Sequence, residues 1–173
     1  MQVQDFLAKS RVRYVYHFTD VANLPLIRVH GLLPYDDLLS RGIIPPKPGG
    51  DEQSRQSDEC RGLGAYVHLC FKNEHPMEYV ACRDGRIGPT RFLEVSPAVL
   101  LRPGVMGCCE LANRNGARLL TLSEALDEMD LDILFNLEMD FSDCLKRQRW
   151  NEARKAEILV PGGIPAAFIA NLS

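Results

Sequence analysis

The strongest constraint on the fold is a series of short segments rich in β-branched and aromatic residues. Segments with polar or helical spacing separate them, so regular βαβ winding is disfavoured and an α+β fold, with helices inserted between short strands, is predicted. The last two segments flank Pro161-Gly162-Gly163 and are expected to pair as a hairpin. The predicted strands cover residues 13–18, 66–71, 90–95, 105–109, 156–160 and 166–171.

Helix signals lie between these strands. Asp20 and Asn23 can each cap a helix start after the first strand, and Gly31 supplies a stop for that helix. Further helices are expected over residues 76–85 and 120–135, and residues 142–155 should form a polar helix or an ordered loop. Residues 34–64 are dominated by Pro, Gly, Ser and charge, so little ordered structure is expected there. A loop of this length is usually functional or disordered.

Length and composition limit the class of protein. A chain of 173 residues with 46% hydrophobic content predicts one domain over residues 1–173. It has no basic leader followed by an apolar run and a cleavage site, and no apolar run approaches the roughly 18 residues of a membrane span. We therefore expect a cytoplasmic protein without a membrane partner.

The cysteines do not indicate a metal site. Six cysteines form no CxxC pair and occur with only four scattered histidines, which is not a zinc-ligand pattern. Cysteine often behaves as a small apolar residue in cytosolic proteins. Reduced thiols and no bound metal are therefore expected.

Charge gives no general attraction to nucleic acid, because the formal net charge is -3. One local basic cluster exists, within which Glu152 is the only acid. It fits either a solvated helix face or a phosphate-binding surface, and the tryptophan inside it fits either a core anchor or a base-stacking platform. The residues concerned are Lys146, Arg147, Arg149, Trp150, Arg154 and Lys155.

Three polar residues accompany predicted strands. His17 and Thr19 end the stretch "YVYHFTD", and Glu157 precedes the apolar run "ILV". Each has an ordinary explanation: a hydrogen-bonded core histidine, a turn hydroxyl and a solvent-facing glutamate. The common catalytic motifs GxSxG, HExxH, GxGxxG and the Walker phosphate loop are absent from the sequence.

Taken together, several segments resemble the DarT family of DNA ADP-ribosyltransferases. The resemblance covers most of the chain in order and spacing, although the long loop is hard to align. His68 and Glu74 stand where the best-known members carry other residues. The matching segments are "YHFTDVANLPLIRVHGLL", "YVHLCFKNEHPMEYV", "ANRNGARLLTLSEAL" and "RKAEILVPGGIP".

The resemblance implies an ADP-ribosyltransferase-like fold, with a central split antiparallel β-sheet, and NAD+ as the ADP-ribose donor. By motif, Glu157 becomes the catalytic residue, and Arg61, with Arg55 as the alternative, becomes the loop arginine that assists attack by the base. A carboxylate suits this reaction because positive charge builds on the ribose carbon as nicotinamide leaves. The implied NAD+ contacts are His17, Phe18, Thr19, Leu26 and Pro34, with Tyr66 or Tyr79 stacking on a ring.

The resemblance also implies an acceptor and a partner. The acceptor is a base of DNA, expected to be single-stranded because an unpaired base is reached without breaking a duplex. The family further implies a toxin, paired with a macrodomain-type antitoxin (DarG-like) that removes the mark. Transfer to RNA or protein, and an inactive nucleotide-binding module, remain alternative interpretations.

Overall fold

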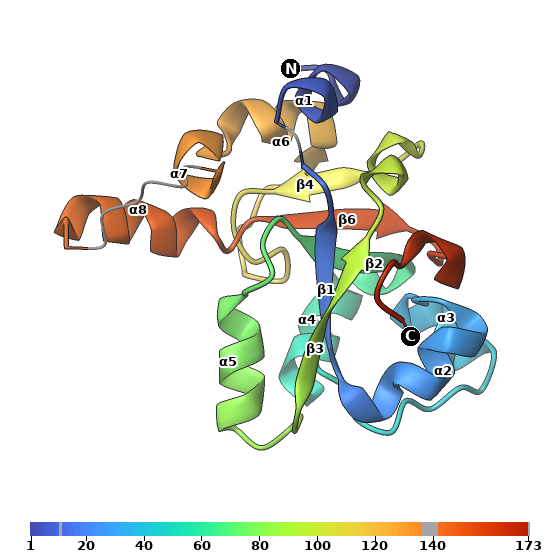
Figure 1. Cartoon of the computed structure of the whole chain (residues 1–173). Helices are drawn as coiled ribbons and strands as arrows, with labels where there is room; N and C mark the ends of the chain where they lie inside the picture. The colour runs from blue at the N-terminus through green and yellow to red at the C-terminus, as the bar shows by residue number, and fades with distance from the viewer. Residues whose placement is uncertain (11, 136–141, 173) are drawn as a thin grey trace.

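The structure is a computed structural model that describes residues 1–10, 12–135 and 142–172. Its centre is a six-stranded sheet in the order β3-β1-β2-β6-β4-β5, in which every neighbouring pair is antiparallel (Figure 1). The predicted α+β class with an antiparallel sheet is therefore confirmed. The strands are β1 (Val15–Asp20), β2 (Tyr66–Cys70), β3 (Thr90–Val95), β4 (Met106–Cys108), β5 (Leu120–Thr121) and β6 (Glu157–Pro161).

The sheet is nearly divided between β1 and β2. Strand β1 pairs with β3 from Val15 to Asp20, and β2 pairs with β6 along its whole length. By contrast, β1 and β2 are in register only at Tyr16 and Cys70. Figure 1 shows the β1–β3 pair running in a different direction from β4 and β6. The two halves of the sheet therefore diverge just beyond Tyr16.

Helices surround this sheet on several sides. Figure 1 shows α2 and α3 on one side of the sheet and α7 and α8 on the other, with α5 beside β3. The α-helices are α1 (Val3–Ser10), α2 (Leu24–His30), α3 (Tyr35–Ser40), α4 (Glu52–Cys60), α5 (Pro76–Arg83), α6 (Leu122–Glu128), α7 (Leu131–Phe135) and α8 (Cys144–Ala153). The 3-10 helices are η1 (Val21–Asn23), η2 (Leu63–Ala65), η3 (Pro97–Leu101) and η4 (Ala166–Phe168).

Three predictions about these elements were wrong. Residues 34–64 contain α3 and α4; α4 is polar, and the Asp51 side chain caps it by accepting the Ser54 N–H. The predicted helix 120–135 is two helices, because Met129 is extended and Asp130 accepts the Ile133 N–H at the start of α7. The first half of the predicted strand 166–171 is the 3-10 helix η4, and Ile169 makes one isolated bridge to β3.

The main core lies between the sheet and the helices α1, α2, α6 and α7. Phe6 of α1 packs edge-on against Phe71, whose ring in turn meets Phe135 of α7. Within the described part of the chain, every helix falls short of the length and apolar character needed to cross a membrane.

Gly31 closes this core beside the C-terminal segment. It ends α2 with φ +75°, and a Cβ there would lie 2.2 Å from the Ile164 carbonyl oxygen. Only glycine fits both the backbone angle and the contact. The next residue, Leu32, then pairs with Ile164, which fixes the C-terminal segment beside α2.

Candidate functional site

A cavity of about 530 Å³ opens where β1 and β2 diverge. Its lining includes residues of β1, β2, α2, α3 and α4 and the first residue of β6. The volume falls within the roughly 300–1,000 Å³ of typical ligand sites. Eight of the site residues named from the sequence, with Arg55 as the alternative arginine, line this one cavity: His17, Phe18, Thr19, Leu26, Pro34, Arg55, Tyr66 and Glu157.

His17 bridges the two diverging strands. Its Nδ1 lies 2.9 Å from the His68 carbonyl oxygen. A carbonyl only accepts hydrogen bonds, so Nδ1 carries the proton and Nε2 is left as an acceptor. Burial lowers the pKa of His17, more than the bond to the His68 carbonyl raises it. The ring is therefore neutral, with a fixed tautomer.

Thr19 and Asn23 fix the end of β1. The Asn23 amide nitrogen donates to Thr19 Oγ1 at 3.1 Å and to the Lys47 carbonyl at 2.7 Å. The Asn23 side-chain oxygen accepts the Lys47 N–H at 3.0 Å. These bonds hold the loop around Lys47 against the strand end, so that Thr19 is only 8% exposed.

Glu157 begins β6, opposite Cys70 of β2 and Cys108 of β4. Its Oε2 accepts a hydrogen bond from His68 Nδ1 at 3.0 Å and from the Ala112 N–H at 3.2 Å. The carboxylate side chain is 13% exposed. The hydrogen-bond donors of Glu157 therefore come from residues distant in the sequence, which the sequence around Glu157 does not predict.

Glu157 and His68 each stabilise the charged form of the other. Burial alone would raise the pKa of Glu157, but the hydrogen bond and charge of His68, the charge of His75 and the Ala112 N–H together hold it below its usual value. Burial likewise opposes a charged His68, but the bond and charge of Glu157 raise the pKa of His68 overall. Glu157 is therefore an anion whose negative charge faces the cavity.

The two candidate arginines lie in different places. Arg55 of α4 lines the cavity and pairs with Glu52 at 3.1 Å. Arg61 caps the end of α4 instead, and its guanidinium donates to the Ala117 carbonyl. Tyr79 on α5 is 66% exposed and is not among the cavity-lining residues, whereas Tyr66 is.

The basic cluster is carried by α8 and its end. Arg149 makes two hydrogen bonds to the Asp130 carboxylate, each 2.8 Å, and Arg154 approaches Glu74 at 3.9 Å. Lys146 and Arg147 are exposed. Trp150 is partly buried against the main core, which favours its interpretation as a core anchor.

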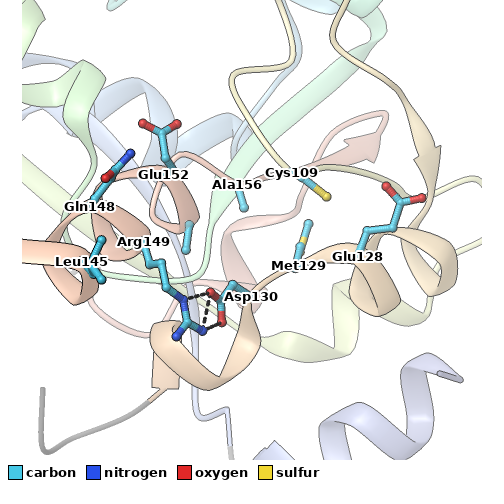
Figure 2. A pocket seen from close by; sticks show the side chains of 10 residues that line it. Cys109, Glu128, Met129, Asp130, Leu145, Gln148, Arg149, Glu152 and Ala156 are labelled. Carbon is cyan, nitrogen blue, oxygen red and sulfur yellow. Dashed lines mark hydrogen bonds and ion pairs between the residues drawn. The ribbon is translucent and has the colours of Figure 1, made fainter.

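A second hollow, of about 570 Å³, lies between α8 and the α6–α7 connection. Figure 2 shows the Arg149–Asp130 pair on its wall, with Glu128 and Glu152 further along and Cys109 and Met129 between. None of the predicted NAD+ contacts lines this hollow.

The cavity-lining residues that were not predicted as site residues include His68, Asp58 and Asn113. His68 was visible only as a departure from the family pattern. Asp58 and Asn113 come from polar segments, and nothing in their local sequence links them to a glutamate many residues away. Among the residues that the structure describes, no cluster of three or more His, Cys, Asp or Glu side chains is arranged for a metal ion.

Comparison with known proteins agrees with the sequence resemblance. The sequence model of the family "DarT: ssDNA thymidine ADP-ribosyltransferase" matches residues 16–172. A comparison with curated protein sequences finds no significant match.

Solved structures share the fold. Thermus sp. 2.9 DarT in complex with ADP-ribosylated ssDNA matches with TM-score 0.65 at 21% identity, over 92% of this chain and 79% of that one. The same Thermus protein in complex with NAD+ gives 0.59 at 22% identity, over 91% and 79%. Thermosipho africanus DarTG in complex with ADP-ribose gives 0.70 at 17% identity, over 91% of this chain and 43% of the other.

Proposed function

The chain belongs to the DarT family of ssDNA thymidine ADP-ribosyltransferases, and we propose that the cavity between β1 and β2 binds NAD+. The protein transfers the ADP-ribose of NAD+ to a base of single-stranded DNA. The observation that carries this proposal is Glu157, an enclosed carboxylate held by His68 and the Ala112 N–H in a cavity that also contains His17 and Thr19.

Glu157 is the catalytic carboxylate in this proposal. The bond between the ribose C1′ and nicotinamide breaks, and its electron pair stays on the nicotinamide nitrogen. Positive charge then builds on the ribose, and a fixed anion beside it stabilises the transition state. Because His68 and Ala112 already hold Oε2, the carboxylate needs little reorganisation as that charge develops.

The β1 residues hold the nucleotide. The neutral His17 offers Nε2 to a hydroxyl donor such as a ribose OH. The ring of Phe18 lies nearly parallel to the rings of His17 and His75, with interplanar angles of 14° and 19°. Thr19 or nearby backbone fixes the nicotinamide amide. Leu26, Pro34 and Tyr66 supply apolar and aromatic walls.

Arg55 is better placed than Arg61 to assist the acceptor, because it lines the cavity whereas the guanidinium of Arg61 is bonded to the Ala117 carbonyl. This proposal predicts that Arg55→Ala slows transfer to DNA more than Arg61→Ala does. Transfer rates of the two purified variants, compared at equal folded fractions, test the choice.

DNA phosphates are contacted by the start of α8, where Lys146 and Arg147 are exposed. Arg149 and Arg154 already face carboxylates, so they contribute less to phosphate binding. The protein acts in the cytoplasm, as the toxin of a pair whose antitoxin is of the macrodomain type. The likeness to Thermosipho africanus DarTG supports this partner.

The test mixes purified protein, NAD+ and thymidine-containing single-stranded oligonucleotides and detects the product by mass spectrometry. Wild type should add one ADP-ribose mass to the DNA and release nicotinamide. Glu157→Gln, which keeps the size of the side chain, should bind NAD+ but lose transfer. Labelling of RNA or protein in place of DNA would identify another acceptor, and equal activity of wild type and Glu157→Gln would refute the assigned role.

A further inference from the structure

A second carboxyl group lies in the same cavity as Glu157. Asp58, near the end of α4, lines the cavity, and its Oδ1 is enclosed by protein with no hydrogen-bond partner among the described residues. An enclosed carboxylate oxygen without a partner is costly. No hydrogen bond of the described residues accounts for this oxygen, while the carboxyl group as a whole belongs to a residue that lines the reaction cavity.

The surroundings make Asp58 more basic than an ordinary aspartate. Burial raises the pKa of Asp58, the charge of His68 acts against this, the charge of Glu157 adds to it, and the Asn113 side chain offers a hydrogen bond that lowers it. His68 therefore acts on two carboxyl groups, of which only Glu157 is bonded to it. The other charged side chains that line the cavity are Asp36, Arg55, Glu59 and Arg86.

The proposed reaction must also dispose of a proton. The base of thymidine has a single ring N–H, and this nitrogen forms the new bond to C1′ as the bond to nicotinamide breaks. The electron pair of the broken bond neutralises the nicotinamide ring, so the acceptor nitrogen releases its proton without any oxidant or reductant. Glu157, held as an anion by two donors and assigned to the ribose, is poorly suited to accept it.

We infer that Asp58 is the general base of this reaction: its carboxylate accepts the ring proton of the acceptor base while Glu157 stabilises the ribose. This inference rests on the proposed function. A second carboxyl group that lines the cavity of the ribose-binding anion has the chemistry that the step requires.

The decisive variant is Asp58→Asn, which keeps the shape and removes the proton-accepting carboxylate. At saturating NAD+ and oligonucleotide, single-turnover transfer should fall at least about 100-fold, the lower end for loss of a general base. The NAD+ dissociation constant should change less than threefold, roughly the scatter of a neutral substitution. The remaining rate should rise steeply with pH, because alkaline solution removes the ring proton without help.

Two further variants guard against a purely structural effect. Asp58→Glu keeps a carboxylate and should recover part of the lost rate. Asp132→Asn removes the same charge from an exposed position on α7, outside the cavity, and should keep the wild-type rate and pH profile. Thermal melting of each variant shows whether the fold is retained.

The outcomes separate the two proposals. Active wild type with an equally active Asp58→Asn overturns the Asp58 role alone. A folded Asp58→Asn whose loss is the same at every pH, or appears in NAD+ binding, shows a structural role and also overturns it. Wild type that labels no DNA overturns the proposed function, and the Asp58 role with it.

Discussion

Replacing His68 tests the electrostatic design of the cavity most directly. His68→Phe keeps a flat ring but removes the donor that lies 3.0 Å from Glu157 Oε2. Among the described residues, the hydrogen-bond donor left to Glu157 would then be the Ala112 N–H, at 3.2 Å, and burial would favour the protonated form of Glu157. We therefore expect the pKa of Glu157 to rise in the variant, so that activity on the acid side is lost at a higher pH than in wild type.

The size of the effect follows from the exposure of the pair. The side chains of His68 and Glu157 are 31% and 13% exposed, so water screens this contact less than a surface pair. A hydrogen bond to a charged group in such a place contributes about 1.5–3 kcal/mol. For a domain of this length, each kcal/mol corresponds to roughly 2–4 °C in Tm.

The pH dependence of this difference has a defined sign. Glu157 has a lowered folded pKa, so its contribution is present above the unfolded glutamate pKa and is lost as pH falls through the folded value. His68 has a raised folded pKa, so its contribution is complete below the unfolded histidine pKa and is lost as pH rises through the folded value. The stability gap between wild type and His68→Phe should be largest between the two titrations.

Urea unfolding of both proteins over a series of pH values measures that gap. The gap should shrink toward both acid and alkaline ends, although on the alkaline side a neutral His68 can still donate one hydrogen bond. A gap of constant size across the series would show that His68 acts only by packing. An unchanged acid limb of the transfer rate would refute the coupling to Glu157.

Two further predictions concern the frame and the DNA surface. Gly31→Ala should lower the free energy of unfolding by at least about 2 kcal/mol, because it adds both backbone strain and a clash with the backbone. Gly116→Ala should lower it less, because φ is +83° there but no atom lies within 4 Å of the added Cβ. Urea unfolding of the two variants measures the difference. Removing both Lys146 and Arg147 should reduce the slope of log affinity against log salt by about 1.4 in fluorescence titrations of single-stranded DNA, whereas Lys9→Ala on the exposed face of α1 should leave it unchanged.

Much of the sheet was predictable because its strands carry local signals. The predicted segments at 66–71, 90–95 and 156–160 each contain nearly all of an observed strand. By contrast, α4 has no apolar periodicity: it depends on the Asp51 cap and on contacts with η2. The C-terminal segment has strand-like residues, but Pro165 and the contacts beside α2 turn it into η4. Tertiary contacts decided both cases against local propensity.

The site was predictable only in part. The family resemblance placed His17, Thr19 and Glu157 together, and the adjacency of β1, β2 and β6 provides the route by which they meet. No local rule predicts that order of strands, and so none predicts that His68 lies beside Glu157. Asp58 was still harder to identify, because it lies on a helix that the sequence did not reveal.

The same contact serves both the fold and the site. Beyond Tyr16 and Cys70 the strands β1 and β2 no longer pair, and the His17 ring takes the place of a backbone donor by bonding the His68 carbonyl. This bond lets the sheet open into a cavity while keeping a partner for the carbonyl, and it turns Nε2 of His17 into an acceptor. His68 then uses its side chain to hold Glu157. The polar residues of β1 and β2 therefore lie where the two strands separate. The separation creates the cavity, and it also leaves backbone groups without a strand partner, which side chains must then hydrogen-bond.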